Sequence, residues 1–243
     1  MLMQKERSFQ EVYNDIDGDI VNLFRVVRNP EQCAELIRLL ELTPYARDEW
    51  KYCLNNYETE TNPIERARMV YYILISSFVG SLRNSGFSQG GVNYESSPAR
   101  NFENSLKRLP AVAQRFKNVV IENKPAVELC VKWDSPDTLF YIDPPYLPET
   151  RRSFYDYKNE MNLADHQALL DWCLQAKGKI ILSGYDSSFY QVVLENAGWV
   201  THRQKAKCTI GSLSGTDTGT MDRTETLWLS PNAATKLKHN LFS

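Results

Sequence analysis

The sequence lacks any long uninterrupted apolar run. About 20 consecutive apolar residues are needed to cross a bilayer, and no stretch of the 243-residue chain reaches that length. Residues 1–7 also lack the pattern of a secretory signal peptide, which has a charged start followed by an apolar segment. We therefore expect a cytoplasmic protein with no membrane partner.

Closely spaced cysteine and histidine pairs are absent too. The five cysteines are odd in number and scattered, without a Cys-x-x-Cys pair, and the three histidines are equally dispersed. A disulfide framework is typically an even set of cysteines, and a structural zinc site needs paired ligands at short spacing. The sequence therefore predicts no metal and a reducing environment.

An excess of basic residues is also missing. The chain has 28 Lys and Arg against 30 Asp and Glu, a formal net charge of -2. A domain that binds nucleic acid through its overall charge is strongly basic. Any contact with nucleic acid must therefore come from a local group of basic side chains.

What the chain does have is enough apolar sequence for a full core, because 42% of its residues are hydrophobic. Its second half alternates β-rich runs with helical periodicity, which is typical of an α/β fold with a mainly parallel sheet. Two late β-rich runs follow each other without a helix, which predicts an antiparallel hairpin at one sheet edge. The predicted strands are 119–122, 139–143 and 179–183, the helices are 163–177 and 187–197, and the hairpin strands are 199–207 and 224–230.

The first half has a different pattern. A short strand at 11–14 precedes two helical segments, 20–28 and 31–40, and the chain from 43 to 109 is helical with irregular breaks. Within that stretch, residues 66–82 read as a helix that is apolar almost all round. The pattern predicts a lobe at 43–109 inserted into a main domain formed by residues 1–42 and 110–243.

The most informative residues are Asp143, Pro144, Pro145 and Tyr146, which directly follow the predicted strand 139–143. In open α/β sheets, ligands bind beyond the carboxyl ends of the strands. The prolines fix φ and lack N–H groups, so the carbonyls of Asp143 and Pro144 are held as acceptors. A carboxylate and a rigid carbonyl match an amino group with two hydrogens, and the Tyr146 ring is suited to stacking on a base. A strand ended by a stiff turn would explain the prolines but not the flanking Asp and Tyr.

Asp-Pro-Pro-Tyr at a strand end resembles the catalytic motif of DNA methyltransferases that methylate exocyclic amines, and the leading Asp is typical of their adenine-specific branch. The chain resembles the Dam-like adenine methyltransferase family over nearly its whole length. This resemblance implies a Rossmann-like sheet dependent on S-adenosylmethionine, with an inserted, mainly helical DNA-recognition lobe. It implies methyl transfer to the amine of a flipped adenine in double-stranded DNA, with Asp143, Pro144, Pro145 and Tyr146 as catalytic residues.

The resemblance also implies binding residues. The carboxylate of Asp15 would hold the cofactor's ribose hydroxyls, and Ile16 would pack on its adenine. Asn123 and Lys124 align with a segment that lines the cofactor, and Asp143 would lie beside it. In the lobe 43–109, the residues that would contact DNA phosphates or base edges are Ser77, Arg83, Asn84, Arg100, Lys107 and Arg108.

Relatives carry, ahead of the segment that matches residue 1 of this chain, a strand that runs into a glycine-rich cofactor loop. We therefore expect the first strand of the sheet to be missing, S-adenosylmethionine to bind the isolated polypeptide poorly, and a partner or self-association to cover the open edge. A bacterial or phage-encoded protein is implied, from a restriction-modification system or a prophage. The alternatives are an inactive truncated prophage-type remnant or one part of a split methyltransferase with residual DNA binding. Methylation of a cytosine amine or a protein amide is a further alternative, which the leading Asp disfavours.

Overall fold

The computed structural model describes residues 2–78, 82–83, 86–90, 97–147, 158–208 and 221–240, without the side chains of 206–208, 221–223 and 236–240. The chain divides into two compact units, Met1–Pro125 and Ala126–Ser243, and each is described by itself. The predicted boundaries at 42/43 and 109/110 concern functional parts of the chain, and they stay predictions.

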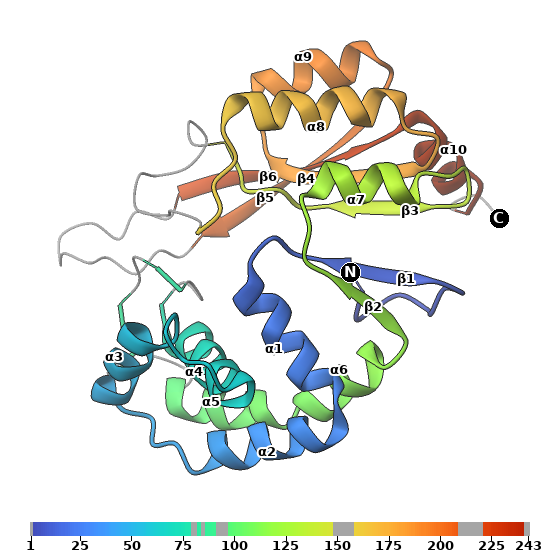
Figure 1. Cartoon of the computed structure of the whole chain (residues 1–243). Helices are drawn as coiled ribbons and strands as arrows, with labels where there is room; N and C mark the ends of the chain where they lie inside the picture. Colours follow the sequence, from blue (N-terminus) through green and yellow to red (C-terminus); the bar gives the residue numbers. More distant parts are fainter. Residues whose placement is uncertain are drawn as a thin grey trace. The chain divides into compact units, whose positions relative to one another are not determined.

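The first unit is mainly helical, with one short parallel ladder (Figure 1). Strand β1 pairs with β2 in a register that runs from Glu11 opposite Val119 to Asn14 opposite Glu122. Three of the helices begin at an Asp or Asn side chain that caps their first backbone N–H groups: Asp17, Asn29 and Asn62. The elements are β1 (Glu11–Asn14), α1 (Gly18–Arg28), α2 (Pro30–Glu41), α3 (Arg47–Asn56), α4 (Pro63–Ser76), α5 (Pro98–Leu106), α6 (Leu109–Phe116) and β2 (Val119–Glu122).

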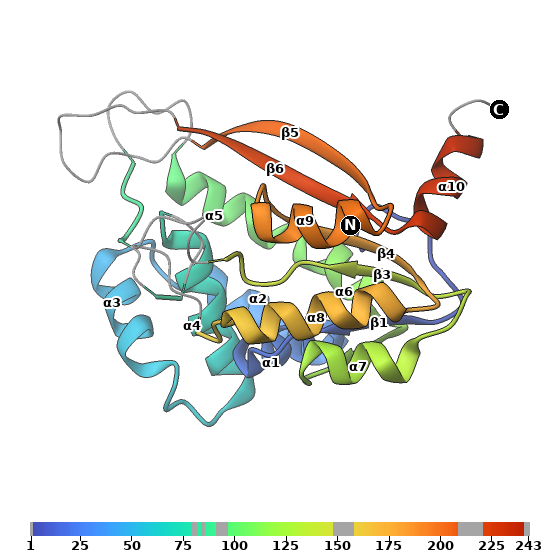
Figure 2. The same ribbon diagram turned by 90° about the horizontal axis from the view of Figure 1, so that it is seen from above.

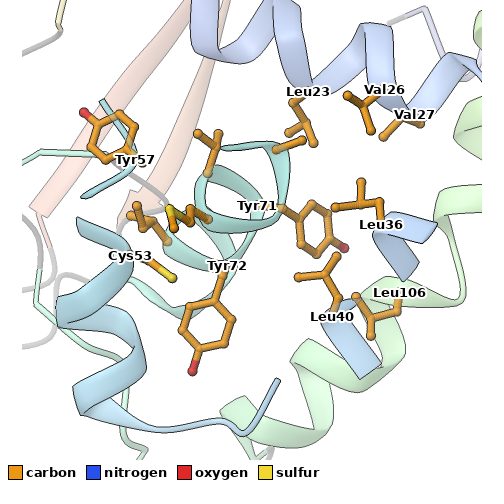
Figure 3. Close-up of a cluster of buried hydrophobic side chains, with 14 of the residues drawn as sticks. Leu23, Val26, Val27, Leu36, Leu40, Cys53, Tyr57, Tyr71, Tyr72 and Leu106 are labelled. Carbon is orange, nitrogen blue, oxygen red and sulfur yellow. The ribbon is translucent and has the colours of Figure 1, made fainter. Parts of the chain in front are cut away.

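Helix α4 forms the centre of this unit's core. Most of its residues are buried, which confirms the prediction of a helix that is apolar almost all round. Figure 3 shows Leu36 and Leu40 of α2 lying close to Tyr71 of α4. The helix ends at Ser76 rather than at the predicted residue 82, because Ser77 adopts an extended conformation and forms an antiparallel bridge with Phe87.

The second unit contains a four-stranded sheet in the order β3-β4-β6-β5. Strand β3 is parallel to β4, whereas β6 is antiparallel to both β4 and β5, so the predicted late hairpin is confirmed. The elements are α7 (Ala126–Trp133), β3 (Leu139–Ile142), α8 (Leu163–Gln175), β4 (Lys179–Tyr185), α9 (Ser188–Asn196), β5 (Val200–Cys208), β6 (Met221–Leu229) and α10 (Pro231–Asn240).

Helices α7, α8 and α9 cover one face of this sheet (Figure 1, Figure 2). Their core includes Ile180, Leu182 and Trp228 from the strands, all fully buried. Ala233 and Ala234 of α10 pack with Leu229 in a separate small cluster.

The predicted α/β composition is confirmed, but the four-stranded sheet is mixed rather than mainly parallel, because only the β3–β4 pair in it is parallel. Within the described residues the strands form two separate sheets, of two and four strands. A single Rossmann-like sheet, and a first strand missing from it, therefore stay predictions.

Candidate active-site turn and nucleotide-binding strand end

The Asp-Pro-Pro-Tyr turn follows β3 directly, as the sequence predicts. The strand ends at Ile142, and residues 143–147 form an irregular segment. Pro144 is buried, which anchors the turn in the second unit, whereas Asp143 is exposed. The carboxylate thus lies at the protein surface on a backbone that two prolines stiffen.

The Asp143 carboxylate is held by the neighbouring strand. The hydroxyl of Ser183 on β4 lies 2.9 Å from Asp143 Oδ1 and 3.2 Å from the carbonyl oxygen of Ile142. Among the described residues, Asp143 Oδ2 has no hydrogen-bond donor. One carboxylate oxygen is therefore fixed while the other can accept a hydrogen bond from a ligand.

The ring of Tyr146 also contacts β4. It meets the ring of Tyr185 edge to face, with centroids 4.4 Å apart and an interplanar angle of 69°. Both rings are partly exposed. In an edge-to-face contact, at most one face of each ring meets the other ring.

A second candidate site lies in the first unit, where β1 ends. The Asp15 carboxylate accepts hydrogen bonds from the backbone N–H of Asp17 at 2.9 Å and from the Tyr13 hydroxyl at 3.1 Å. Burial raises the pKa of Asp15 above its usual value, and the hydrogen bond from Asp17 opposes this shift. Ile16 beside it is 47% exposed, so an apolar surface adjoins the carboxylate.

The end of β2 braces this site. Asn123 Nδ2 donates to the carbonyl oxygens of Asp15 at 2.8 Å and Ile16 at 3.0 Å. The side-chain amide of Asn14 pairs with the backbone of Lys124 in both directions, at 2.9 and 3.0 Å. The structure therefore brings together Asp15, Ile16, Asn123 and Lys124, the four residues of the first unit that the sequence assigns to the cofactor.

The residues assigned to DNA contact differ in their surroundings. Ser77 is buried, and its hydroxyl accepts a hydrogen bond from the indole of Trp50 at 3.0 Å, so it has a structural role. Arg83 pairs with Glu58 at 3.4 Å, and Lys107 pairs with Glu103 at 3.2 Å. The remaining assigned residues are Arg100 and Arg108, which are exposed, and Asn84, which lies outside the described residues.

Four residues that support the two candidate sites were not predicted from the sequence: Tyr13, Asn14, Ser183 and Tyr185. The signal for Ser183 was present, because a parallel pairing of the two predicted strands 139–143 and 179–183 brings their carboxyl ends together. In the observed register Ile142 lies opposite Leu182, so the next residues along each strand are Asp143 and Ser183.

Among the described residues, no group of three or more His, Cys, Asp or Glu side chains is arranged to hold a metal ion. In the part of the chain that the structure describes, no helix combines the length and the apolar character needed to cross a membrane.

A comparison with models of protein families finds a match to this chain. Residues 2–208 match the model of the D12 class N6 adenine-specific DNA methyltransferases. This match spans both candidate sites. A comparison with curated proteins finds no match.

Proposed function

Because the chain belongs to the D12 class N6 adenine-specific DNA methyltransferase family, we propose that it transfers a methyl group from S-adenosylmethionine to the exocyclic amine of adenine in double-stranded DNA. The observation that carries this proposal is the turn after β3. There an exposed carboxylate, a rigid proline carbonyl and an aromatic ring follow one another, and one oxygen of the carboxylate is anchored while the other has no donor among the described residues.

The turn suits direct transfer to an amine. Asp143 and the carbonyl of Pro144 accept the two N–H groups of the amine, which favours a pyramidal nitrogen with its lone pair directed away from the acceptors. The amine nitrogen would form a bond to the methyl carbon as the bond between that carbon and the donor sulfur breaks, and it would then pass one proton along its hydrogen bond to Asp143, so no covalent enzyme intermediate is needed. Pro145 keeps the Pro144 carbonyl in place because it fixes the following backbone.

Tyr146 contacts the ring of the target base rather than its exocyclic amine. An adenine inside a duplex is not accessible to a side chain, so the base has to leave the stack before it reacts. The Tyr146 ring then stacks on the extruded base. Its edge contact with Tyr185 keeps the ring from rotating.

The site at the end of β1 fits the nucleoside part of S-adenosylmethionine. The Asp15 carboxylate accepts hydrogen bonds from the Asp17 N–H and the Tyr13 hydroxyl, and its two oxygens together have lone pairs enough to accept a ribose hydroxyl as well. Ile16 offers an exposed apolar surface for a planar ring, and Asn123 and Lys124 hold the backbone around it. When bound, the cofactor supplies an electrophilic methyl group.

The lobe 43–109 is proposed to select the DNA target. Arg100 and Arg108 are exposed and suited to phosphate contacts. Arg83 and Lys107 would exchange their ion pairs with Glu58 and Glu103 for phosphates, and exposed pairs of this kind cost little to break. We place the protein in a bacterial or phage-encoded modification system.

Methyl incorporation tests the proposal. The chain is incubated with adenine-containing duplex DNA and S-adenosylmethionine labelled in the methyl group, and the product bases are separated. We expect labelled N6-methyladenine from the wild type and a loss of about 100-fold or more in D143A, on the scale of removing one charge-stabilising group from an active site.

The matched control is D137A, which removes an exposed carboxylate just before β3, at the opposite end of the strand from the turn. It should retain the wild-type rate. Incorporation that survives in D143A would contradict the role of Asp143. A wild type that binds DNA but transfers no label would instead indicate a non-catalytic remnant or one part of a split enzyme.

A further inference from the structure

Two side chains of β4 contact the two ends of the Asp-Pro-Pro-Tyr turn. The Ser183 hydroxyl bonds to the Asp143 carboxylate, and the Tyr185 ring packs against the Tyr146 ring. We propose that Ser183 and Tyr185 are positioning residues, which orient the carboxylate and the ring of the turn for the target base. This inference rests on the function proposed above and adds two residues to it.

The turn needs such anchors because its own backbone cannot supply them. Pro144 and Pro145 have no N–H groups, so the hydrogen-bond ladder between β3 and β4 cannot continue along the turn. The exposed Asp143 side chain would otherwise rotate among several rotamers. A hydrogen bond from a side chain of the next strand restricts this rotation.

Ser183 is suited to this role because it is only 5% exposed, so water competes poorly for its hydroxyl. The hydroxyl has one proton and two acceptors within reach, Asp143 Oδ1 at 2.9 Å and the Ile142 carbonyl oxygen at 3.2 Å. The carboxylate is the nearer acceptor, and a charged acceptor forms the stronger bond. The hydroxyl of Ser183 therefore donates its hydrogen bond mainly to Asp143, and this bond fixes one oxygen of the carboxylate.

Strand β4 is a rigid base for both contacts. It pairs with β3 on one side and with β6 on the other, and Ser183 lies opposite Leu227 of β6. Ser183 and Tyr185 are two residues apart, so their side chains project to the same face of the strand. One face of one central strand thus sets the positions of both Asp143 and Tyr146.

The test for Ser183 compares S183A and S183T with T226V. Thr226 is a matched control, because it is a buried hydroxyl on the adjacent strand β6, where it lies opposite Gly184, and it has no hydrogen-bond partner among the described residues. We expect S183A to lower kcat by about 10- to 100-fold, as a misplaced reacting group does, while KM for DNA changes less than about twofold. S183T keeps a hydroxyl and should recover most of the rate, and T226V should match the wild type.

A wild-type kcat in S183A, or an equal loss of kcat in T226V, would overturn the role of Ser183. If S183A unfolds, S183C replaces it, because a thiol is a weak donor of similar shape. The prediction for S183C is the same loss of kcat.

The test for Tyr185 compares Y185L with Y185F. The phenylalanine keeps the ring edge that meets Tyr146, whereas leucine removes it. We expect Y185L to lower kcat by about 10-fold, the equivalent of losing one aromatic pair, and Y185F to recover most of that rate because it keeps the ring. Equal activity of all three proteins would overturn the role of Tyr185.

A separate measurement distinguishes failure of this inference from failure of the proposed function. If the wild type transfers no methyl group, the proposed function fails, but the Ser183 contact can still be read from the ¹³C resonance of the Asp143 carboxyl carbon. The chemical shift of that carbon should change in S183A, whereas the chemical shift of the Asp137 carboxyl carbon should not. An unchanged Asp143 resonance would show that Ser183 does not hold the carboxylate.

Discussion

Asn123, directly after β2, donates hydrogen bonds from its side-chain Nδ2 to two carbonyl oxygens of the turn after β1, those of Asp15 and Ile16. This turn also carries the Asp15 carboxylate, which accepts the N–H of Asp17. A side chain from one strand therefore fixes the backbone on which the proposed ribose ligand stands.

We predict that N123A loosens this turn. Each neutral hydrogen bond contributes about 1 kcal/mol, and their loss should speed hydrogen exchange of the Asp17 amide by roughly 10-fold, with a similar loss of affinity for S-adenosylmethionine. Hydrogen exchange followed by NMR measures the first effect, and calorimetric titration measures the second. N55A, an exposed asparagine on α3, should leave both unchanged. An unaltered Asp17 amide in N123A would contradict the bracing role.

A buried ion pair between Glu11 and Arg115 predicts a dependence of stability on pH. Arg115 donates two hydrogen bonds to the Glu11 carboxylate, at 2.5 and 2.8 Å, and Glu11 is 8% exposed. The hydrogen bond from Arg115 lowers the pKa of Glu11 from 4.5 to about 2. The stabilisation is therefore fully present above about pH 4.5 and is lost as the pH falls toward 2.

We predict that E11Q lowers the free energy of unfolding by about 2–3 kcal/mol at pH 7, and that the difference from the wild type shrinks as the pH falls from 4.5 toward 2. Urea denaturation at a series of pH values measures both. Glu35 and Arg38 form the same two-bond pair at 2.7 Å on an exposed helix surface, so E35Q should change stability little. If the difference in the free energy of unfolding between E11Q and the wild type stayed constant across this pH range, ionisation of the Glu11 carboxylate would not be the cause of that difference.

Two features of the second unit were predictable from local signals in the sequence. The placement of Asp143 at a strand end was predictable, because an apolar run followed by two prolines has to leave the sheet there. The antiparallel hairpin was predictable because β5 and β6 follow each other without a helix between them. These are local signals, carried by neighbouring residues.

What sequence did not predict depends on contacts between distant residues. Helix α4 ends at Ser76 because Ser77 bridges to Phe87, and nothing in the apolar pattern of the helix signals that bridge. The contact between Ser183 and Asp143 depends on the register of two strands 40 residues apart. Helix α7 was missed because it has only eight residues, too few for a clear helical period.

For Ser77, the sequence and the structure support different roles, and an experiment can distinguish them. The sequence assigns it to DNA contact, whereas its buried hydroxyl accepts the indole N–H of Trp50. We predict that S77A lowers the free energy of unfolding by about 1–3 kcal/mol, because the Trp50 donor loses its partner, and that it leaves DNA affinity unchanged. R100A should leave stability unchanged and weaken DNA binding. It should also reduce the slope of log K against log salt concentration by about the amount that one phosphate contact contributes. DNA titrations at several salt concentrations, with unfolding curves of each variant, separate the two effects. Weaker DNA binding by a fully stable S77A would restore the sequence assignment.

Gly178, between α8 and β4, packs closely against the start of β3, the strand that leads to the proposed active-site turn. A Cβ at this position would lie 2.6 Å from Phe140 Cε2 and 3.1 Å from the backbone oxygen of Thr138, so a side chain would push on β3. The Asp134 carboxylate accepts the N–H groups of Lys177 and Gly178, which limits how far the turn can move away.

We predict that G178A destabilises the protein by about 1–3 kcal/mol through overpacking, and that it also lowers kcat because β3 carries Asp143. G198A is the matched control, because Gly198 has a φ of +79° but open space around its Cβ position. It should cost about 1 kcal/mol through backbone strain alone and leave kcat unchanged. Thermal unfolding and methyl-transfer rates of the two variants measure this contrast. A G178A protein as stable as G198A and fully active would mean that β3 can shift without disturbing the turn, which would also weaken the case for Ser183 as an anchor.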